Sequence, residues 1–202
     1  MKEKEIKLLL NTTFHRHFGI SDIDWGELAE DTVIVECNKN TYIRKAHQYE
    51  RSLNYLLEGA TGNFAYKKDK LVCVDLCFQG DFFGDYSSLI LQQKSPLEIR
   101  ALVQTKYFSI PFSKLLEFYA QQSPIVIEQI GRRSAEHLYV LKSKELLESK
   151  TLSARERYVD LLKNRPGIFQ DISLKYIASY LGVTAESLSR IRRSLAKDEF
   201  LP

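Results

Sequence analysis

The chain is poor in the residues on which most metal and redox chemistry depends. Only three cysteines occur in 202 residues, Cys37, Cys73 and Cys77, and none of them has the CxxC spacing of a zinc or redox site. An iron–sulfur cluster needs about four thiolates within reach of one point. His15 and His17 lie near the N-terminus, where we expect solvated side chains. We therefore predict small buried cysteines, no metal and no cofactor.

Long apolar runs and enzyme signatures are also missing. No segment approaches the roughly 18 consecutive apolar residues of a membrane helix, and the apolar part of residues 1–19 is too short for a signal peptide. Gly-x-Ser-x-Gly, His-Glu-x-x-His and P-loop motifs do not occur. With 44% hydrophobic and 27% charged residues, these absences predict a soluble cytoplasmic protein that contacts no membrane and is not an enzyme.

Positive charge is concentrated toward the C-terminus. Residues 150–202 carry ten Lys and Arg against six Asp and Glu, whereas residues 1–149 carry nineteen against twenty. A basic excess on one segment is typical of proteins that release counterions from a phosphate backbone.

Residues 174–195 have the pattern of two helices joined by a tight turn. Gly182 stands where the chain must reverse, because glycine adopts a positive φ without a Cβ penalty, and Thr184 can cap the following helix. Apolar residues at helical spacing would bury the inner faces of both helices: Ile177, Ala178, Leu181, Leu188, Ile191 and Leu195. The outer face of the second helix is then polar and basic.

That outer face carries side chains suited to DNA. The guanidinium fork of Arg190 can meet guanine O6 and N7, and Glu186 can accept from cytosine N4, so both are predicted to read bases. Ser189 can bond to a base or a phosphate. Phosphate contacts are expected from the helix start, its flanks and the preceding helix, at Thr184, Ser187, Arg192, Arg193, Ser173 and Lys175. The alternative is an ordinary helical hairpin with a solvated charged face.

The region between Thr32 and Pro111 has the pattern of strands. Short runs rich in β-branched and aromatic residues, separated by turn residues, occupy residues 32–37, 41–46, 52–59, 62–67, 71–78, 98–103 and 106–111. Both alternating sets in residues 71–78 are mostly apolar, which predicts a strand covered on both faces. We expect a small antiparallel barrel or roll.

A long helix is predicted from Ser123 to about Leu147. Ser123 is a good cap, and Pro124 fits the first turn. One narrow apolar stripe follows at spacings of three and four: Ile127, Ile130, Ser134, Leu138 and Leu141. At 1.5 Å per residue about 24 residues extend about 36 Å, so the stripe is predicted to pack against the same helix of a second subunit. The alternative is packing on the chain's own barrel.

A capping box at Ser153 and Glu156 predicts a further helix, and residues 168–172 are apolar enough for a short strand. The chain is therefore divided into a β-roll over residues 1–122, a dimerisation helix over residues 123–149 and a helical unit over residues 150–202.

This order of parts resembles the cyclic-AMP receptor protein/fumarate-nitrate-reduction regulator superfamily. Residues 79–85, QGDFFGD, are similar to the start of its phosphate-binding cassette, and residues 186–190, ESLSR, are similar to its E-x-x-S-R recognition helix. The resemblance implies an α+β fold with a cyclic-nucleotide-binding-like roll, a dimer helix and a helix-turn-helix. It also implies that Glu186, Ser189 and Arg190 read TTGA-like half-sites in an inverted repeat. Because the sequence stops at Pro202, the C-terminal wing strands of many members are expected to be missing.

The effector pocket departs from the family pattern. Where cyclic-AMP binders have an Arg-Ser pair, this chain has Ser95 and Pro96, which supply neither the positive charge nor the amide donor. Gly84 and Asp85 begin the predicted pocket, and Lys94 and Arg100 could still serve another anion. Cyclic AMP is therefore not expected to bind, and the effector is left unidentified.

These features predict a homodimeric, sequence-specific DNA-binding transcription regulator with residues 184–197 in the major groove. Double-stranded DNA and a second copy are the expected partners, and RNA polymerase is a further partner that this function implies. The alternative is a receptor for a small anion or nucleotide whose helical domain mediates protein contacts.

Overall fold

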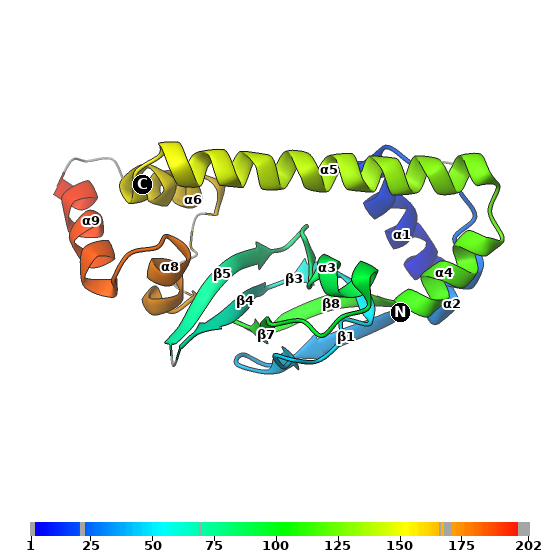
Figure 1. The fold of residues 1–202 in the computed structure, drawn as a ribbon, viewed down its shortest axis with the longest axis horizontal. Helices are drawn as coiled ribbons and strands as arrows, with labels where there is room; N and C mark the ends of the chain where they lie inside the picture. Colours follow the sequence, from blue (N-terminus) through cyan, green and yellow to red (C-terminus); the bar gives the residue numbers. More distant parts are fainter. Residues whose placement is uncertain (1–2, 21–22, 69, 166, 168–170, 198–202) are drawn as a thin grey trace.

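The computed structural model describes residues 3–20, 23–68, 70–165, 167 and 171–197. Figure 1 shows a long helix running above a β-roll, with short helices at both ends of the roll. Among the described residues, no helix combines the length and the apolar character that crossing a membrane requires.

Two four-stranded antiparallel sheets form the roll, as predicted. One sheet has the order β1-β8-β3-β6 and the other β2-β7-β4-β5. The strands are β1 (Val33–Cys37), β2 (Tyr42–Arg44), β3 (Ser52–Glu58), β4 (Ala60–Lys67), β5 (Lys70–Phe78), β6 (Phe82–Phe83), β7 (Glu98–Ala101) and β8 (Thr105–Pro111). Alternate residues of both sheets meet between them, at Leu56, Cys77, Phe83, Ile99 and Tyr107.

The helices of the N-terminal half are α1 (Glu3–Phe18), α2 (Gly26–Asp31), α3 (Tyr86–Leu91) and α4 (Phe112–Ala120). Helices α1, α2 and α4 bury aromatic side chains against the first sheet, including Phe14, Trp25 and Phe118. The expectation of solvated histidines was wrong for His17: its ring is half-buried, whereas His15 is exposed. Cys73 and Cys77 are buried as predicted, and burial raises the pKa of both thiols.

The long helix α5 (Pro124–Thr151) begins as predicted and ends four residues later. The Ser123 hydroxyl accepts from the Val126 amide at 3.4 Å. Ile130 is only 1% exposed and packs in the core formed by α1, α2 and α4. The dimer contact predicted for Ile130 is therefore wrong, because the chain's own N-terminal helices already cover this side chain.

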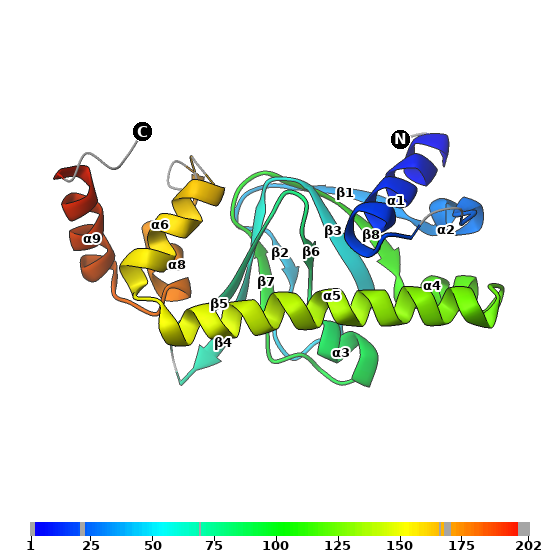
Figure 2. The same cartoon turned by 90° about the horizontal axis from the view of Figure 1, so that it is seen from above.

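The C-terminal helices share a core with the second sheet. They are α6 (Ala154–Asn164), α8 (Leu174–Tyr180) and α9 (Ala185–Lys197), and the capping box between Ser153 and Glu156 is confirmed. One apolar cluster joins Leu181 and Leu188 of these helices to Phe64, Cys73 and Leu76 of β4 and β5. Figure 2 shows α9 at one end of the molecule, beyond the roll.

Two predictions concern the ends of this region. Of the expected strand at 168–172, residues 168–170 lie outside the described residues, while Asp171 is helical and Ile172 is not in a strand. Residues 198–202, on which the expected lack of wing strands depends, also lie outside the described part of the chain.

Candidate functional site

Helices α8 and α9 form the predicted helix-turn-helix. Gly182 has a φ of +72° in the turn between them, which is a conformation that side chains with a Cβ rarely adopt. The Thr184 hydroxyl accepts from the Ser187 amide at 3.1 Å and so caps α9. Leu188 is 0% and Leu195 4% exposed, which fixes the inner face of α9 against α8 and α6.

The outer face of α9 is open to solvent. Glu186, Arg190 and Arg193 are exposed, and Ser189 is half-buried between them. Hydrogen bonds from its own backbone amide and from Thr184, together with the nearby charge of Arg190, hold the pKa of Glu186 below its usual range. Glu186 therefore stays ionised and can accept a hydrogen bond at neutral pH.

The residues predicted to hold phosphates differ in how exposed their side chains are. Ser173 and Lys175 of the α8 segment are exposed, as are Arg192 and Arg193 on the far part of α9. Arg192 hydrogen-bonds the buried Tyr158 hydroxyl of α6, so its guanidinium lies on the flank of α9 next to the body of the protein. Ser187 is half-buried and its hydroxyl bonds to that of Thr184 at 3.1 Å.

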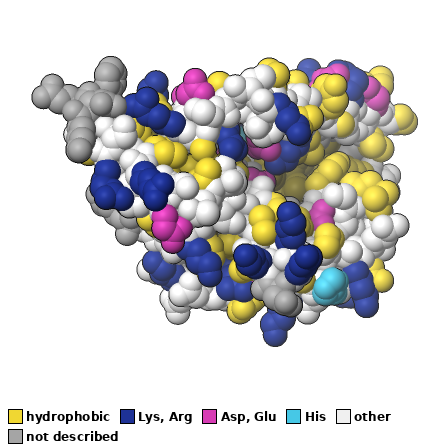
Figure 3. All heavy atoms as spheres, turned by 60° about the vertical axis from the view of Figure 1, so that its left-hand side comes forward, with side chains coloured by type: hydrophobic (Ala, Val, Ile, Leu, Met, Phe, Trp, Pro, Cys, Tyr) yellow, Lys and Arg dark blue, Asp and Glu magenta, His cyan; other side chains and the backbone are white. Residues whose placement is uncertain are grey.

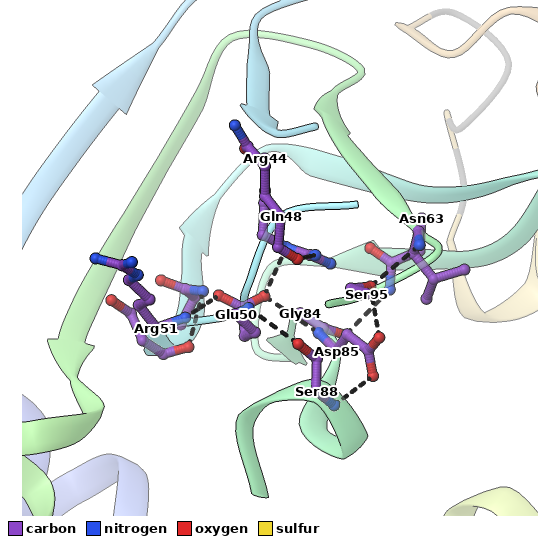
Figure 4. Close-up of polar contacts among 12 residues, drawn as sticks. Arg44, Gln48, Glu50, Arg51, Asn63, Gly84, Asp85, Ser88 and Ser95 are labelled. Atoms are coloured by element: carbon purple, nitrogen blue, oxygen red, sulfur yellow. Dashed lines mark hydrogen bonds and ion pairs between the residues drawn. The ribbon is translucent and has the colours of Figure 1, made fainter. Parts of the chain in front are cut away.

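A second group of polar side chains lies inside the roll, at the predicted effector pocket (Figure 4). Asp85 accepts from the Ser95 hydroxyl at 2.5 Å, from the Ser87 hydroxyl at 2.8 Å and from the Ser88 amide at 3.1 Å. Burial opposes ionisation, but these hydrogen bonds hold the pKa of Asp85 below its usual range. The Asp85 carboxylate is thus fully engaged by the chain itself.

Glu50 and Arg44 complete this group, and the sequence analysis missed both. They form an ion pair at 3.1 Å in which each side chain is 7% exposed. The Glu50 carboxylate also accepts from the backbone amides of Asp85 and Arg51, each at 3.2 Å. Burial raises the pKa of Glu50, although the Arg44 charge and these amides oppose the shift. An anion of the chain therefore already occupies the donors beside Gly84.

Gly84 makes the approach of Glu50 feasible. A Cβ at this position would lie 2.9 Å from the Glu50 carboxylate oxygen, and the φ of Gly84 is +132°. No simple sequence pattern pairs Glu50 with Gly84, because 34 positions separate them and only the pairing of β3 with β6 brings the two segments together.

Not all of the predicted pocket residues lie close together in the structure. Gly84, Asp85 and Ser95 come together, whereas Lys94 is exposed. Arg100 pairs with Glu98 and lies 4.4 Å from the centre of the Tyr42 ring. Its neighbour Ile99 points between the two sheets, so Arg100 points to the opposite face of β7.

Exposed apolar side chains on α5 form a different stripe from the predicted one. Ile127, Ser134 and Leu138 are half-buried in the single chain, and Leu141 is 43% exposed. Ile125, in the first turn, is 69% exposed, and in the second half of the helix the most exposed apolar residues are Tyr139, Val140, Leu146 and Leu147. Tyr139 and Leu146 are seven residues apart, as are Val140 and Leu147, so each pair shares one face of the helix. A seven-residue spacing in the sequence could have revealed these residues.

Comparisons with protein-family models and with curated protein sequences find no match. Solved structures do match. FixK2 of Bradyrhizobium japonicum is 21% identical with a TM-score of 0.68, over 85% of this chain and 87% of that one. The c-di-GMP responsive global regulator CLP of Xanthomonas campestris is 16% identical with a TM-score of 0.61, over 84% and 88%.

The transcriptional regulator DNR of Pseudomonas aeruginosa is 16% identical with a TM-score of 0.57, over 98% of this chain and 90% of that one. The match to DNR covers nearly all of this chain, so it includes the roll, the long helix and the C-terminal helices together. The α+β architecture implied by the sequence resemblance is confirmed: this chain has the fold of the cyclic-AMP receptor protein/fumarate-nitrate-reduction regulators.

Proposed function

We propose that the chain is a homodimeric, sequence-specific DNA-binding transcription regulator. Residues 184–197 enter the major groove, Arg190 and Glu186 read bases, and the half-site is TTGA-like within an inverted repeat. RNA polymerase is the further partner that activation or repression of transcription implies.

One observation carries the proposal, the division of α9 into two faces. Leu188 and Leu195 anchor the helix in the apolar core, while Glu186, Arg190 and Arg193 project from the other side. The exposed face thus carries side chains of the kinds that read base edges and hold phosphates. Likeness of fold to the regulators DNR and CLP supports the same function.

The exposed stripe of α5 supports a dimer. Tyr139 is 75% and Leu146 61% exposed, and apolar side chains repeated every seven residues on a long helix are typical of a helix that packs against its own copy. In a symmetric dimer the two α9 helices would enter successive major grooves about 34 Å apart, one turn of the duplex.

We further propose that the roll does not bind cyclic AMP. Glu50 and Asp85 already occupy the donors that would hold the cyclic phosphate, and Ser95 brings no positive charge to replace that lost from the family's arginine. Tight binding of a cyclic nucleotide together with no DNA binding would instead support the receptor alternative.

The test is selection of bound duplexes from a random-sequence library, followed by affinity measurements on the selected site. Arg190→Ala should weaken specific binding by about 1–3 kcal/mol and relax the base preference at one position of each half-site. Arg193→Ala should weaken all sequences alike and lower the slope of log affinity against log salt by about 2, because the dimer loses two phosphate contacts.

Arg132→Ala serves as the control, because Arg132 is an exposed arginine on α5, remote from α9. Its DNA affinity should match that of the wild type. Selection that enriches no sequence, or an Arg190→Ala protein with unchanged affinity for the selected site, would contradict the proposed reading of DNA by α9.

A further inference from the structure

The tip of the β4–β5 hairpin carries a cluster of lysines that folding alone does not explain. Lys67 and Lys70 are direct partners across the antiparallel pair, and Lys68 follows Lys67 in the turn. All three are exposed. Like charges placed directly opposite each other on paired strands destabilise the pair.

The backbone at this tip adds to the cost. Lys68 has a φ of +54°, a left-handed conformation that residues with a Cβ adopt only rarely. No carboxylate of the described residues pairs with Lys67, Lys68 or Lys70, and Asp69, between them in the sequence, lies outside the described part of the chain. Bound anions beside the tip would offset the repulsion between Lys67 and Lys70.

Contacts with α8 hold the hairpin next to the helix-turn-helix. The ring of Phe64 on β4 lies 4.9 Å from that of Tyr176 on α8, and the Cys73 amide of β5 donates to the Ser179 hydroxyl at 2.9 Å. Lys67 follows Phe64 by three residues, so the tip begins about 10 Å along the strand from Tyr176. Helix α8 contacts β5, and Figure 1 shows these two elements side by side.

The position beside α8 decides which partner the lysines face. In a helix-turn-helix the second helix enters the groove while the first crosses the phosphate backbone. An element packed against α8 therefore lies next to the phosphates that flank the half-site. Lys175 of α8 is exposed as well. Figure 3 turns this end of the molecule forward and shows Lys and Arg side chains spread over it, with few Asp and Glu.

We propose that Lys67, Lys68 and Lys70 form a second DNA-binding surface, in which the roll itself holds the phosphate backbone outside the half-site read by α9. This inference rests on the proposed DNA-binding function and extends the contact from the helix-turn-helix to the sensor roll. Lysine is suited to such contacts, because it binds phosphate as a mobile point charge and imposes no base preference.

The test compares two duplexes that carry the same selected inverted repeat. One spans about two helical turns and the other about four, with the repeat at the centre. The variant K67Q/K68Q/K70Q should bind the long duplex about tenfold or more weakly than the wild type, and its salt slope on that duplex should be lower by about 2 to 3. On the short duplex the two proteins should differ much less.

The control for net charge is K4Q/K7Q/K114Q, which removes three lysines from α1 and α4 at the opposite end of the molecule. Lys7 and Lys114 have carboxylate partners there, so the thermal midpoint of this variant is measured beside its DNA affinity. Loss of folding is not expected in the hairpin variant, because it removes the repulsion between Lys67 and Lys70. Its thermal midpoint should equal or exceed that of the wild type.

Four outcomes overturn the inference. If the wild type binds neither duplex, the proposed function fails and the inference fails with it. If the wild type binds both and the hairpin variant keeps full affinity and salt slope on the long duplex, the inference alone fails. If the hairpin and control variants lose DNA affinity equally, the loss comes from the change in net charge and not from the hairpin. A hairpin variant that self-associates but binds DNA normally would show that the lysines only protect the edge strand β5.

Discussion

At the scale of single residues, the polar group inside the roll contains a buried ion pair. Arg44 and Glu50 are both nearly covered, and Glu50 also takes amide donors of Asp85 and Arg51. A buried pair gives little net stability compared with apolar side chains of the same volume, but either charge left alone is costly.

Breaking this pair should therefore be far more harmful than replacing it. Arg44→Met should lower the free energy of unfolding by about 3–5 kcal/mol, because Glu50 remains buried without its partner, whereas R44M/E50L should recover most of the loss. Urea unfolding of the three proteins measures both values. Equal destabilisation in the single and double variants would contradict the description of Glu50 as a charge neutralised by Arg44.

At the scale of elements, the junction of α1, α5 and the roll contains two histidines among aromatic rings. The His17 ring lies 5.5 Å from that of His137 and 5.3 Å from that of Phe82, and its Nε2 is 3.3 Å from the Tyr55 hydroxyl. Burial, followed by the nearby His137 and Arg16, lowers the pKa of His17 from its ordinary 6.5. The neutral ring is thus the form that fits this junction.

The lowered pKa of His17 determines how the free energy of unfolding changes with pH. Below pH 6.5 the unfolded chain binds a proton at His17 that the folded chain still excludes, so the free energy of unfolding decreases as the pH falls from 6.5 toward the lowered pKa. His17→Phe should remove this part of the dependence when stability is measured by denaturant unfolding from pH 7.5 to 5. The control His15→Gln, at an exposed position of the same helix, should retain it.

Element boundaries also show what the sequence could predict. The caps at Ser123, Ser153 and Thr184 are local hydrogen bonds, so residue type and spacing were enough to place three helix starts correctly. Helix α1 was not predicted, because its apolar residues are buried in a core that includes Phe108, which lies far along the chain. Of the strand predicted at residues 168–172 only Asp171 and Ile172 are described, and Ile172 joins the core of the C-terminal helices.

At the scale of the whole molecule, the exposed half of α5 is the feature that a single chain leaves uncovered. Val140 and Leu147 are 63% and 62% exposed, next to the lysines and glutamates that pair along the same helix. Apolar residues of this size are normally covered when they form a continuous helical stripe. A second α5 running alongside would cover them.

Introducing charge into this stripe should separate the subunits. Tyr139→Glu or Leu146→Glu should raise the dimer dissociation constant by about a hundredfold or more, since an unpaired charge buried in an interface costs roughly 3 kcal/mol or more. Sedimentation equilibrium measures the change, and circular dichroism checks that the chain stays folded. Leu116→Glu, at a half-exposed leucine of α4, is the control. A dimer that survives both α5 variants would place the interface elsewhere.

The sequence by itself determined the parts whose signals are local. Strand alternation, helix periodicity and the caps specified the roll, the long helix and the two faces of α9, because each depends on neighbours a few residues away. Tertiary structure alone decided which faces are covered. Tertiary packing buries Ile130 in the protein's own core and directs Arg100 away from Asp85. It also brings Glu50 next to Gly84 and the β4–β5 hairpin next to α8. These outcomes depend on the pairing of distant segments, which no local pattern encodes.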